Sequence, residues 1–328
     1  MSIHVRSDRL TVRMAGAPQV YLSGTIDSDA VQRVRRLLQR GRIRPGSDVY
    51  LDSSTGDVAS GMALGRLFRS ARLSTHLGTW RGDVRYGKPG RPATCLDACA
   101  YAYLGGLYRW SPTGADRIGL HPSLLPGANG TQPGEPTRQV LRDYLEAMDV
   151  RPRYLAQVLT PAVDGVVWWN ADKMAPWLVS NNGRLRLMAD YRATPGAPEL
   201  VMTQVVRNGQ NQIALQCRPG QVTFTARYTV GRLRARRLAR HAAYAYVEID
   251  HKAWQPRHGE RPEARGDAVT FTRQLPFTTL APMLDTVSLG AWVRLERNPL
   301  RFGFLMAPVA VRQQARPFYA ACQAVQPK

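Results

Sequence analysis

Apolar and polar residues change their spacing once along the chain, between residues 187 and 199. In the first part, short apolar runs alternate with longer segments whose apolar residues recur at the i, i+3, i+4, i+7 spacing of a helix. Strands are predicted at residues 19–24, 48–52 and 73–77, and helices at residues 28–40, 57–71, 97–104, 137–148 and 172–179. Strands that alternate with helices are typical of a parallel sheet with crossover helices.

From residue 199 onward, many apolar and polar residues alternate with the period of a half-buried strand. Strands are predicted at residues 200–206, 212–217, 221–230, 243–249, 268–275 and 301–306, and a closing helix at residues 309–325. The segment RATPGAP at residues 192–198 has the composition of a linker. We therefore expect an α/β domain at residues 1–187, a linker at 188–198, and a mostly antiparallel β-domain with a C-terminal helix at 199–328.

The chain has 328 residues and a formal net charge of +21, which first points to nucleic acid. Only four of its 45 basic residues are lysines, however, and the arginines are dispersed along the chain. Phosphate binding needs positive charge rather than arginine alone, so this skew also fits codon bias in a GC-rich genome. A nucleic-acid-binding protein is kept as an alternative. An apolar fraction of 44% excludes a disordered chain, and no apolar run approaches the ~20 residues of a membrane span.

Four cysteines allow two disulfides in any of three pairings, or four free thiols: Cys95, Cys99, Cys217 and Cys322. Zinc is disfavoured, because no His or Cys pair at zinc-finger spacing lies near the first two cysteines. We expect neither a metal nor a cofactor. The chain begins MSIHVR, which is not a secretory signal peptide. It is therefore expected to be cytoplasmic, or to be the mature form of an exported protein.

Three short segments of the first domain carry candidate chemistry. Residues 51–61 (LDSSTGDVASG) end a strand in a turn of small residues, where backbone N–H groups can face an anion. Residues 94–106 (TCLDACAYAYLGG) form a second turn that leads into a helix. Residues 118–122 (IGLHP) end a strand with a histidine, His121.

In this order and spacing, the three segments resemble the ClpP-like serine proteases, and most closely the predicted periplasmic members of the ClpP/crotonase-like superfamily. That family has an S-x-G-G turn for the oxyanion hole, a C-x-S-A-C turn with the nucleophilic serine, and a G-x-H strand with the base. Residues 53–56, 95–99 and 119–121 match these motifs. The resemblance covers residues 18–182 and implies a ClpP/crotonase-like fold. It places the oxyanion cleft at Thr55 (a glycine in the family), Gly56, Asp57 and Ala98.

The family's serine position is occupied by Asp97. A carboxylate cannot replace serine by simple deprotonation, and loss of the nucleophile leaves only the residual catalysis of the oxyanion hole and binding. The resemblance makes His121 the former base and Asp164 the candidate third triad member, although Val166 falls closer to the expected position. Asp97 is alternatively a helix N-cap or the ion-pair partner of an arginine.

Two enzyme hypotheses stay open for the same residues. In the first, the chain is a hydrolase or peptidase with a non-standard nucleophile, such as Asp97, Ser54 or Ser123. In the second, Asp97 and His121 are the acid/base pair of a crotonase-like enzyme that acts on acyl-CoA thioesters. Against the second, no basic pocket for the CoA phosphates can be singled out among so many arginines.

The second domain contains the densest basic run, residues 231–240 (GRLRARRLAR), with Arg232, Arg234, Arg236, Arg237 and Arg240. We expect a solvated helix or hairpin face, or a surface for an acidic partner or anionic lipid. The positions of Cys217 and Cys322 are similar to those in small envelope β-domains whose terminal cysteine is tied to an early strand. That resemblance implies a disulfide between them. As a separate hypothesis, Cys95 and Cys99, which flank Asp97 at the turn that resembles the family's C-x-S-A-C motif, form a second disulfide that pins this turn.

Together these features predict an envelope protein, periplasmic or secreted, with a degenerate ClpP-like domain followed by a β-domain. Its expected work is to bind a protein, a peptide or an envelope component rather than to cleave it. The trimers and rings of the superfamily imply self-association, and the high positive charge favours an acidic partner.

Overall fold

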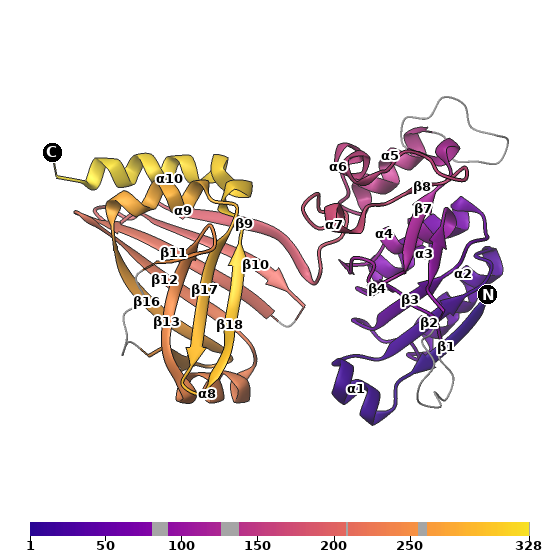
Figure 1. Cartoon of the computed structure of the whole chain (residues 1–328), viewed down its shortest axis with the longest axis horizontal. Helices are drawn as coiled ribbons and strands as arrows, with labels where there is room; N and C mark the ends of the chain where they lie inside the picture. Colours follow the sequence, from indigo (N-terminus) through magenta and orange to yellow (C-terminus); the bar gives the residue numbers. More distant parts are fainter. Residues whose placement is uncertain (81–90, 126–137, 208, 255–260, 328) are drawn as a thin grey trace. The chain divides into compact units, whose positions relative to one another are not determined.

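The computed structural model describes residues 1–80, 91–125, 138–207, 209–254 and 261–327. The chain forms two compact units, Met1–Gly183 (unit 1) and Arg184–Lys328 (unit 2). Each unit has its own core of buried apolar side chains. The predicted fold class is confirmed: an α/β unit with a mostly parallel sheet and crossover helices precedes antiparallel sheets and a C-terminal helix (Figure 1).

Unit 1 is built on a five-stranded sheet of order β1-β2-β3-β4-β6. The strands are β1 (Ser2–Arg6), β2 (Gln19–Ser23), β3 (Asp48–Asp52), β4 (Ser74–Leu77) and β6 (Tyr108–Arg109). β1 is antiparallel to β2, and the other neighbours are parallel. Two crossover helices, α2 (Ser28–Gln39) and α3 (Val58–Ser70), share one apolar core with the sheet.

Aspartates begin these helices. The Asp27 carboxylate accepts a hydrogen bond from the Ala30 N–H at the start of α2, and the Asp57 carboxylate accepts one from the Ser60 N–H at the start of α3. Each carboxylate satisfies an N–H group that has no partner inside its helix. The short helix α1 (Arg9–Ala15) begins in the same way at Asp8.

A smaller sheet of order β5-β7-β8 carries the second and third sequence motifs. β5 (Thr94–Leu96) is parallel to β7 (Arg117–Leu120), and β8 (Val167–Trp168) is antiparallel to β7. Helix α4 (Ala98–Leu104) follows β5 and packs closely on α3 through glycines. A Cβ on Gly61 would overlap the backbone of Ala98, and a Cβ on Gly105 would overlap the backbone of Gly65. The glycines Gly61 and Gly65 of α3 therefore set how closely α4 approaches.

The remaining helices of unit 1 are short: η1 (Pro122–Leu124), α5 (Arg138–Ala147), α6 (Pro152–Val158) and α7 (Ala171–Met174). The helix predicted at 172–179 is thus shorter than expected, because the chain turns at Leu178, which has a φ of 57°. Residue 137, where the preceding helix was predicted to begin, lies outside the described residues.

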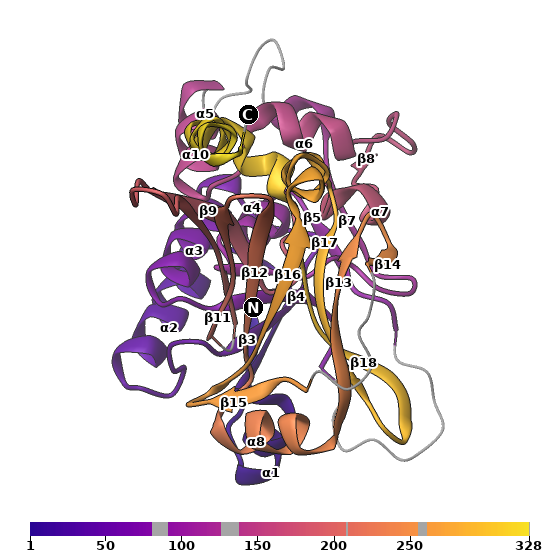
Figure 2. The ribbon, with the colours of Figure 1, turned by 90° about the vertical axis from the view of Figure 1, so that its left-hand side faces the viewer.

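Unit 2 contains two antiparallel sheets (Figure 2), of order β15-β16-β12-β11-β10-β9 and β14-β13-β17-β18. The strands are β9 (Arg184–Arg192), β10 (Glu199–Val206), β11 (Gly209–Arg218), β12 (Gln221–Thr229), β13 (Ala242–Ile249), β14 (Lys252–Trp254), β15 (Glu263–Arg265), β16 (Ala268–Pro276), β17 (Leu289–Leu295) and β18 (Asn298–Met306). Leu215 and Phe224 from the first sheet share a core with Val247 and Ala291 from the second.

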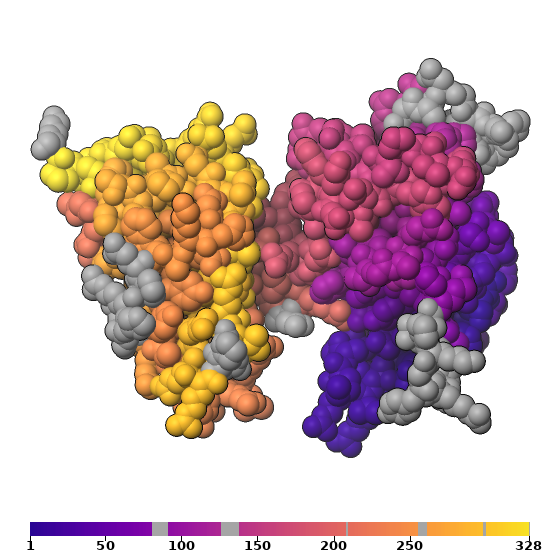
Figure 3. Space-filling view, viewed as in Figure 1, coloured from indigo at the N-terminus to yellow at the C-terminus, as the bar shows by residue number. Residues whose placement is uncertain are grey.

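Three helices complete unit 2: α8 (Arg232–His241), α9 (Leu280–Asp285) and α10 (Arg312–Val325). Helix α10 packs on β9, β10 and β11 and forms the upper, yellow surface of unit 2 in Figure 3. A disulfide between Cys217 in β11 and Cys322 in α10, with Cα atoms 5.5 Å apart, fixes this contact. Helix α8 lies at the opposite end of the unit (Figures 1 and 2).

Strand β9 was missed by the sequence pattern, and the expected linker at 188–198 begins inside it. Along this edge strand only Leu187 is buried, and Leu185, Ala189 and Tyr191 are half-buried at alternate positions of the same face. Its backbone is paired with β10 along almost its full length. This alternation runs across residue 187, the expected end of the first domain, which divides it between a domain and a linker.

Candidate functional site

Asp97 lies at a sharp turn between β5 and α4. Its φ is 50° and its ψ is −104°, a backbone conformation that residues with a Cβ seldom adopt. The Asp97 N–H donates to the Gly119 carbonyl of β7, and the Asp97 carbonyl accepts from the Tyr101 N–H in α4. Asp97 thus joins the end of β5 to the start of α4.

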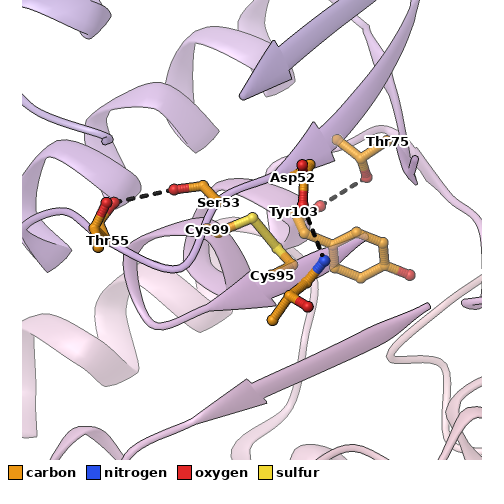
Figure 4. Close-up of a disulfide and its surroundings, with 8 residues drawn as sticks. Asp52, Ser53, Thr55, Thr75, Cys95, Cys99 and Tyr103 are labelled. Atoms are coloured by element: carbon orange, nitrogen blue, oxygen red, sulfur yellow. Dashed lines mark hydrogen bonds between the residues drawn. A yellow bond between two sulfur atoms is a disulfide. The ribbon is translucent and has the colours of Figure 1, made fainter. Parts of the chain in front are cut away.

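A disulfide between Cys95 and Cys99 brackets this turn, with Cα atoms 5.1 Å apart. Figure 4 shows it beside the end of β3, where Ser53 forms a parallel bridge with Cys95. Both cysteines are fully buried. The disulfide, the bridge and the glycine contacts of α4 together hold Asp97 in its strained conformation.

Asp97 and His121 form a direct pair. The Asp97 carboxylate accepts two hydrogen bonds from His121: one from the backbone N–H to Oδ1 at 2.8 Å, and one from the ring Nδ1 to Oδ2 at 2.6 Å. Because a carboxylate only accepts, the ring hydrogen of this pair sits on Nδ1. The Asp97 side chain is 19% exposed and the His121 side chain 48% exposed. Two motifs separated by 24 residues therefore meet in one hydrogen-bonded pair.

The predicted oxyanion turn, residues 55–57, lies next to the strand that precedes α2. Gly56 has a φ of 145°, and a Cβ there would overlap Ile26, so only glycine fits this bridge. The Asp57 N–H donates to the Ile26 carbonyl, and the Thr55 carbonyl accepts from the Ile26 N–H. The Asp57 amide is thus engaged in the bridge. Among the described residues, the amides of Gly56 and Ala98 donate to no protein acceptor.

Asp164, the candidate third triad residue, lies on an exposed turn that the Val163–Val166 bridge closes. Within the described part of the chain, no hydrogen bond or ion pair joins it to His121. The antiparallel register pairs Gly119 with Trp168 and Leu120 with Val167. Val166 is buried, and its side chain lies next to Gly119, where an added Cβ would come 3.0 Å from it.

A cavity of about 570 Å³ opens at the carboxyl ends of β2, β3 and β4, and the sequence pattern had not indicated it. Hydroxyl groups of Ser23, Ser53, Ser54, Thr55, Thr79 and Thr94 line much of it. Asp52 is buried at its floor, forms an ion pair with Arg91, and accepts a hydrogen bond from the Thr94 N–H at 3.1 Å. The cavity shares Ser53, Thr55 and Thr94 with the two turns described above. In the sequence, Asp52 at the end of the strand at 48–52 is the feature that could have indicated this cavity.

One wall of this cavity is aromatic. Trp80 stacks on His4 with ring centroids 4.7 Å apart, and its edge meets Tyr21 at 5.1 Å. The row continues across the sheet from Tyr21 to Tyr50 and then to His76, at 4.7 Å for each step. All of these side chains are only partly buried. The sheet face opposite the crossover helices therefore presents a half-exposed aromatic row that leads to the cavity.

No group of three or more His, Cys, Asp or Glu side chains that could hold a metal ion occurs among the described residues. Within the same residues, none of the helices combines the length and apolar character needed to cross a bilayer.

No protein-family model matches the sequence, and no curated protein matches it either. Solved structures give distant likenesses. A mutant of the 1510-N membrane-bound stomatin-specific protease has a TM-score of 0.33 and 15% identity, covering 49% of this chain and 75% of that one. A second mutant, in complex with a substrate peptide, gives 0.34 and 14%, over 49% and 71%. A ClpP1 mutant from Listeria monocytogenes gives 0.33 and 14%, over 52% and 94%.

Proposed function

We propose that the protein is a ClpP-like pseudoenzyme of the bacterial envelope, which binds a protein or peptide and does not cleave it. The observation that carries this proposal is the pairing of Asp97 with His121 at the turn where the resembling family has its serine. Both carboxylate oxygens accept hydrogen bonds, which lowers their nucleophilicity. The same contact orients the His121 ring, and among the described residues no hydroxyl donates to that ring. A serine-type acyl transfer therefore lacks its hydroxyl nucleophile at this position.

The cavity at the ends of β2, β3 and β4 is the binding surface in this proposal. Its hydroxyl groups and the Arg91 guanidinium offer hydrogen bonds to peptide carbonyls and carboxylates. Trp80 offers an apolar wall for one side chain of a bound segment. A carboxylate-bearing partner also suits a chain with a net charge of +21.

Labelling with a fluorophosphonate probe tests the loss of the nucleophile. The native chain is expected to remain unlabelled, since it has no activated serine. Asp97→Ser restores the family's residue on the same strained turn, and that variant is expected to gain labelling. The double variant Asp97→Ser with His121→Ala should lose the label again. Labelling of the native chain contradicts the pseudoenzyme proposal, and an unlabelled Asp97→Ser variant contradicts the placement of Asp97 at the serine position.

Fluorescein-labelled casein, an unstructured acidic protein, provides a probe of binding. Anisotropy is expected to rise with the native chain, and Trp80→Ala and Arg91→Ala are each expected to weaken binding by about tenfold. Arg142→Ala, an exposed arginine on α5, is the matched control and should bind as the native chain does. If neither cavity substitution weakens casein binding, the partner binds to another surface, and this assignment is contradicted.

Hydrolysis is the second candidate, and one observation favours it. With Nδ1 held by Asp97, Nε2 of this half-exposed imidazole has no partner among the described residues, which is the arrangement of an oriented general base. Such a base could activate water toward an ester or an acyl-CoA thioester. Turnover of p-nitrophenyl acetate or acetyl-CoA that disappears in His121→Ala would support this candidate. An equal rate in both proteins would contradict it.

The envelope location is supported by the two disulfides, which use all four cysteines of the chain. Disulfides persist in the periplasm and outside the cell and are rare in the reducing cytoplasm.

A further inference from the structure

Helix α8 presents an unneutralised basic face. Its five arginines, Arg232, Arg234, Arg236, Arg237 and Arg240, are all exposed, while Ala235 and Leu238 are buried against the unit. The helix contains no acidic residue, and none of its arginines forms an ion pair with a described acidic residue. The positive charges of such a helix repel one another unless an anionic surface binds to it.

Leu233 stands among these arginines with 84% of its surface exposed. It is the most exposed of the large apolar side chains in the described residues. A leucine in this setting gains nothing from the fold of unit 2. Its position, flanked by Arg232 and Arg234, is typical of a residue that enters the apolar layer beneath a charged surface.

A cavity of about 930 Å³ lies directly beside this face. The lining has four basic and four apolar residues: Arg234, Arg237, His241 and Arg297, and Leu233, Leu238, Leu295 and Phe302. The Arg234 guanidinium lies 5.9 Å from the Phe302 ring centroid, so the charge sits above an apolar floor. The acidic residue in the lining, Glu296, forms an ion pair with Arg261 at 2.6 Å.

We propose that α8 and this cavity bind the surface of an anionic phospholipid bilayer. The arginines pair with lipid phosphates, for which the planar guanidinium is well suited. Leu233 inserts among the acyl chains, and the cavity accepts a lipid that has both an anionic and an apolar part. Charge alone would suit nucleic acid equally well, but phosphate contacts to nucleic acid leave no partner for the exposed leucine or the apolar floor.

Co-sedimentation with vesicles tests this proposal on the full chain. Vesicles of phosphatidylcholine with phosphatidylglycerol are expected to bind the protein, and pure phosphatidylcholine is expected to bind it poorly. The double variant Arg234→Gln with Arg237→Gln should bind about 30-fold more weakly, because each basic residue near an anionic membrane contributes roughly a fivefold gain. Leu233→Ser, which leaves the charge unchanged, should bind about tenfold more weakly.

A matched control removes the same charge elsewhere on unit 2. Arg218→Gln with Arg316→Gln changes two exposed arginines away from α8 and is expected to retain native binding. A loss equal to that of the α8 variant would show that net charge alone drives binding and would overturn the proposal. Unchanged vesicle binding by Leu233→Ser would overturn it as well. DNA or polyglutamate that displaces the vesicles, and that binds Leu233→Ser as tightly as it binds the native chain, would also overturn it. Asp97→Ser should bind vesicles normally, so the proposal stands independently of the function of unit 1.

Discussion

Asp97 and His121 share two hydrogen bonds through one carboxylate, from the backbone N–H at 2.8 Å and from the ring Nδ1 at 2.6 Å. The carboxylate reaches back to the strand end that carries the histidine, and so fixes both the ring and its backbone. In a serine triad the corresponding acid lies on a third segment. Here the acid that meets the histidine is Asp97, at the turn between β5 and α4.

Asp97→Asn is expected to change the tautomer of His121. The amide can still accept the backbone N–H, but its NH₂ group cannot accept from Nδ1–H when it faces the ring. We expect the ring hydrogen to move to Nε2 and the free energy of unfolding to fall by about 1–2 kcal/mol. Two-dimensional ¹H–¹⁵N spectra of the imidazole nitrogens would measure the tautomer. Asp164→Asn, on an exposed turn, is the control, and an equal effect there would contradict the pairing.

Loss of the Cys217–Cys322 disulfide is expected to destabilise unit 2 strongly. This disulfide closes a loop of 105 residues, which corresponds to about 4–5 kcal/mol in the chain-entropy model. Cys217→Ala with Cys322→Ala should lower the unfolding midpoint of unit 2 in denaturant. The Cys95–Cys99 disulfide closes a far shorter loop. Its removal by Cys95→Ala with Cys99→Ala should therefore lower the free energy of unfolding by only about 2 kcal/mol. The reverse order of the two losses would contradict the prediction.

Arg109→Met is expected to lower the free energy of unfolding of unit 1 by about 3 kcal/mol. Arg109 is 2% exposed and donates to the carbonyls of Val179, Leu178 and Met148 at 2.8, 3.2 and 3.1 Å. Burial lowers its pKa to about 10, with a further contribution from the neighbouring Arg69.

The loss follows because methionine fills the space but removes a donor from the Val179 and Leu178 carbonyls, while the Met148 carbonyl keeps its hydrogen bond from Arg69. Urea unfolding would measure it, with Arg142→Met on the exposed face of α5 as control. A change below about 0.5 kcal/mol, the range of neutral surface substitutions, would contradict a structural role for Arg109.

Stability is expected to fall once the pH rises above about 10. Burial raises the pKa of Tyr101, Tyr103 and Tyr144 above the usual value of 10.0. Their hydroxyls donate to carbonyls within unit 1, for example from Tyr101 to Leu124 at 2.7 Å. In the unfolded chain the same tyrosines ionise near pH 10. The unfolded state then binds fewer protons than the folded state, so a rising pH favours unfolding.

Tyrosine absorbance near 295 nm during an alkaline titration would measure this effect. Tyr101, Tyr103 and Tyr144 should ionise only as unit 1 unfolds. Tyr144→Phe should make the loss of stability less steep. Complete ionisation of all tyrosines near pH 10 in the folded chain would contradict the prediction.

Local patterns were sufficient for many elements, although strands such as β1 and β17 were not predicted. The strand at 48–52 and the helices at 28–40 and 57–71 were predicted within one residue of their observed ends, because caps and apolar spacing define them. Strand β9 was missed because its alternating residues, 185–191, span the expected end of the first domain at 187. Its last residues, 188–192, occupy the start of the expected linker. The basic run at 231–240 left helix and hairpin open, and contacts with the strands β15, β16 and β17 settle it as a helix.

The sequence alone determined which residues stand at the two turns and at the end of β7, since motif order and spacing are properties of the chain. It also supplied the pairings implied by the resemblance, and both disulfides are present. Only the tertiary structure decided what Asp97 contacts. The choice between a helix cap, an arginine partner and His121 depends on where β5 and β7 lie side by side, which their hydrogen-bond register fixes. The cavity and the aromatic row likewise arise from strands distant in sequence, because only parallel pairing brings their ends to one edge.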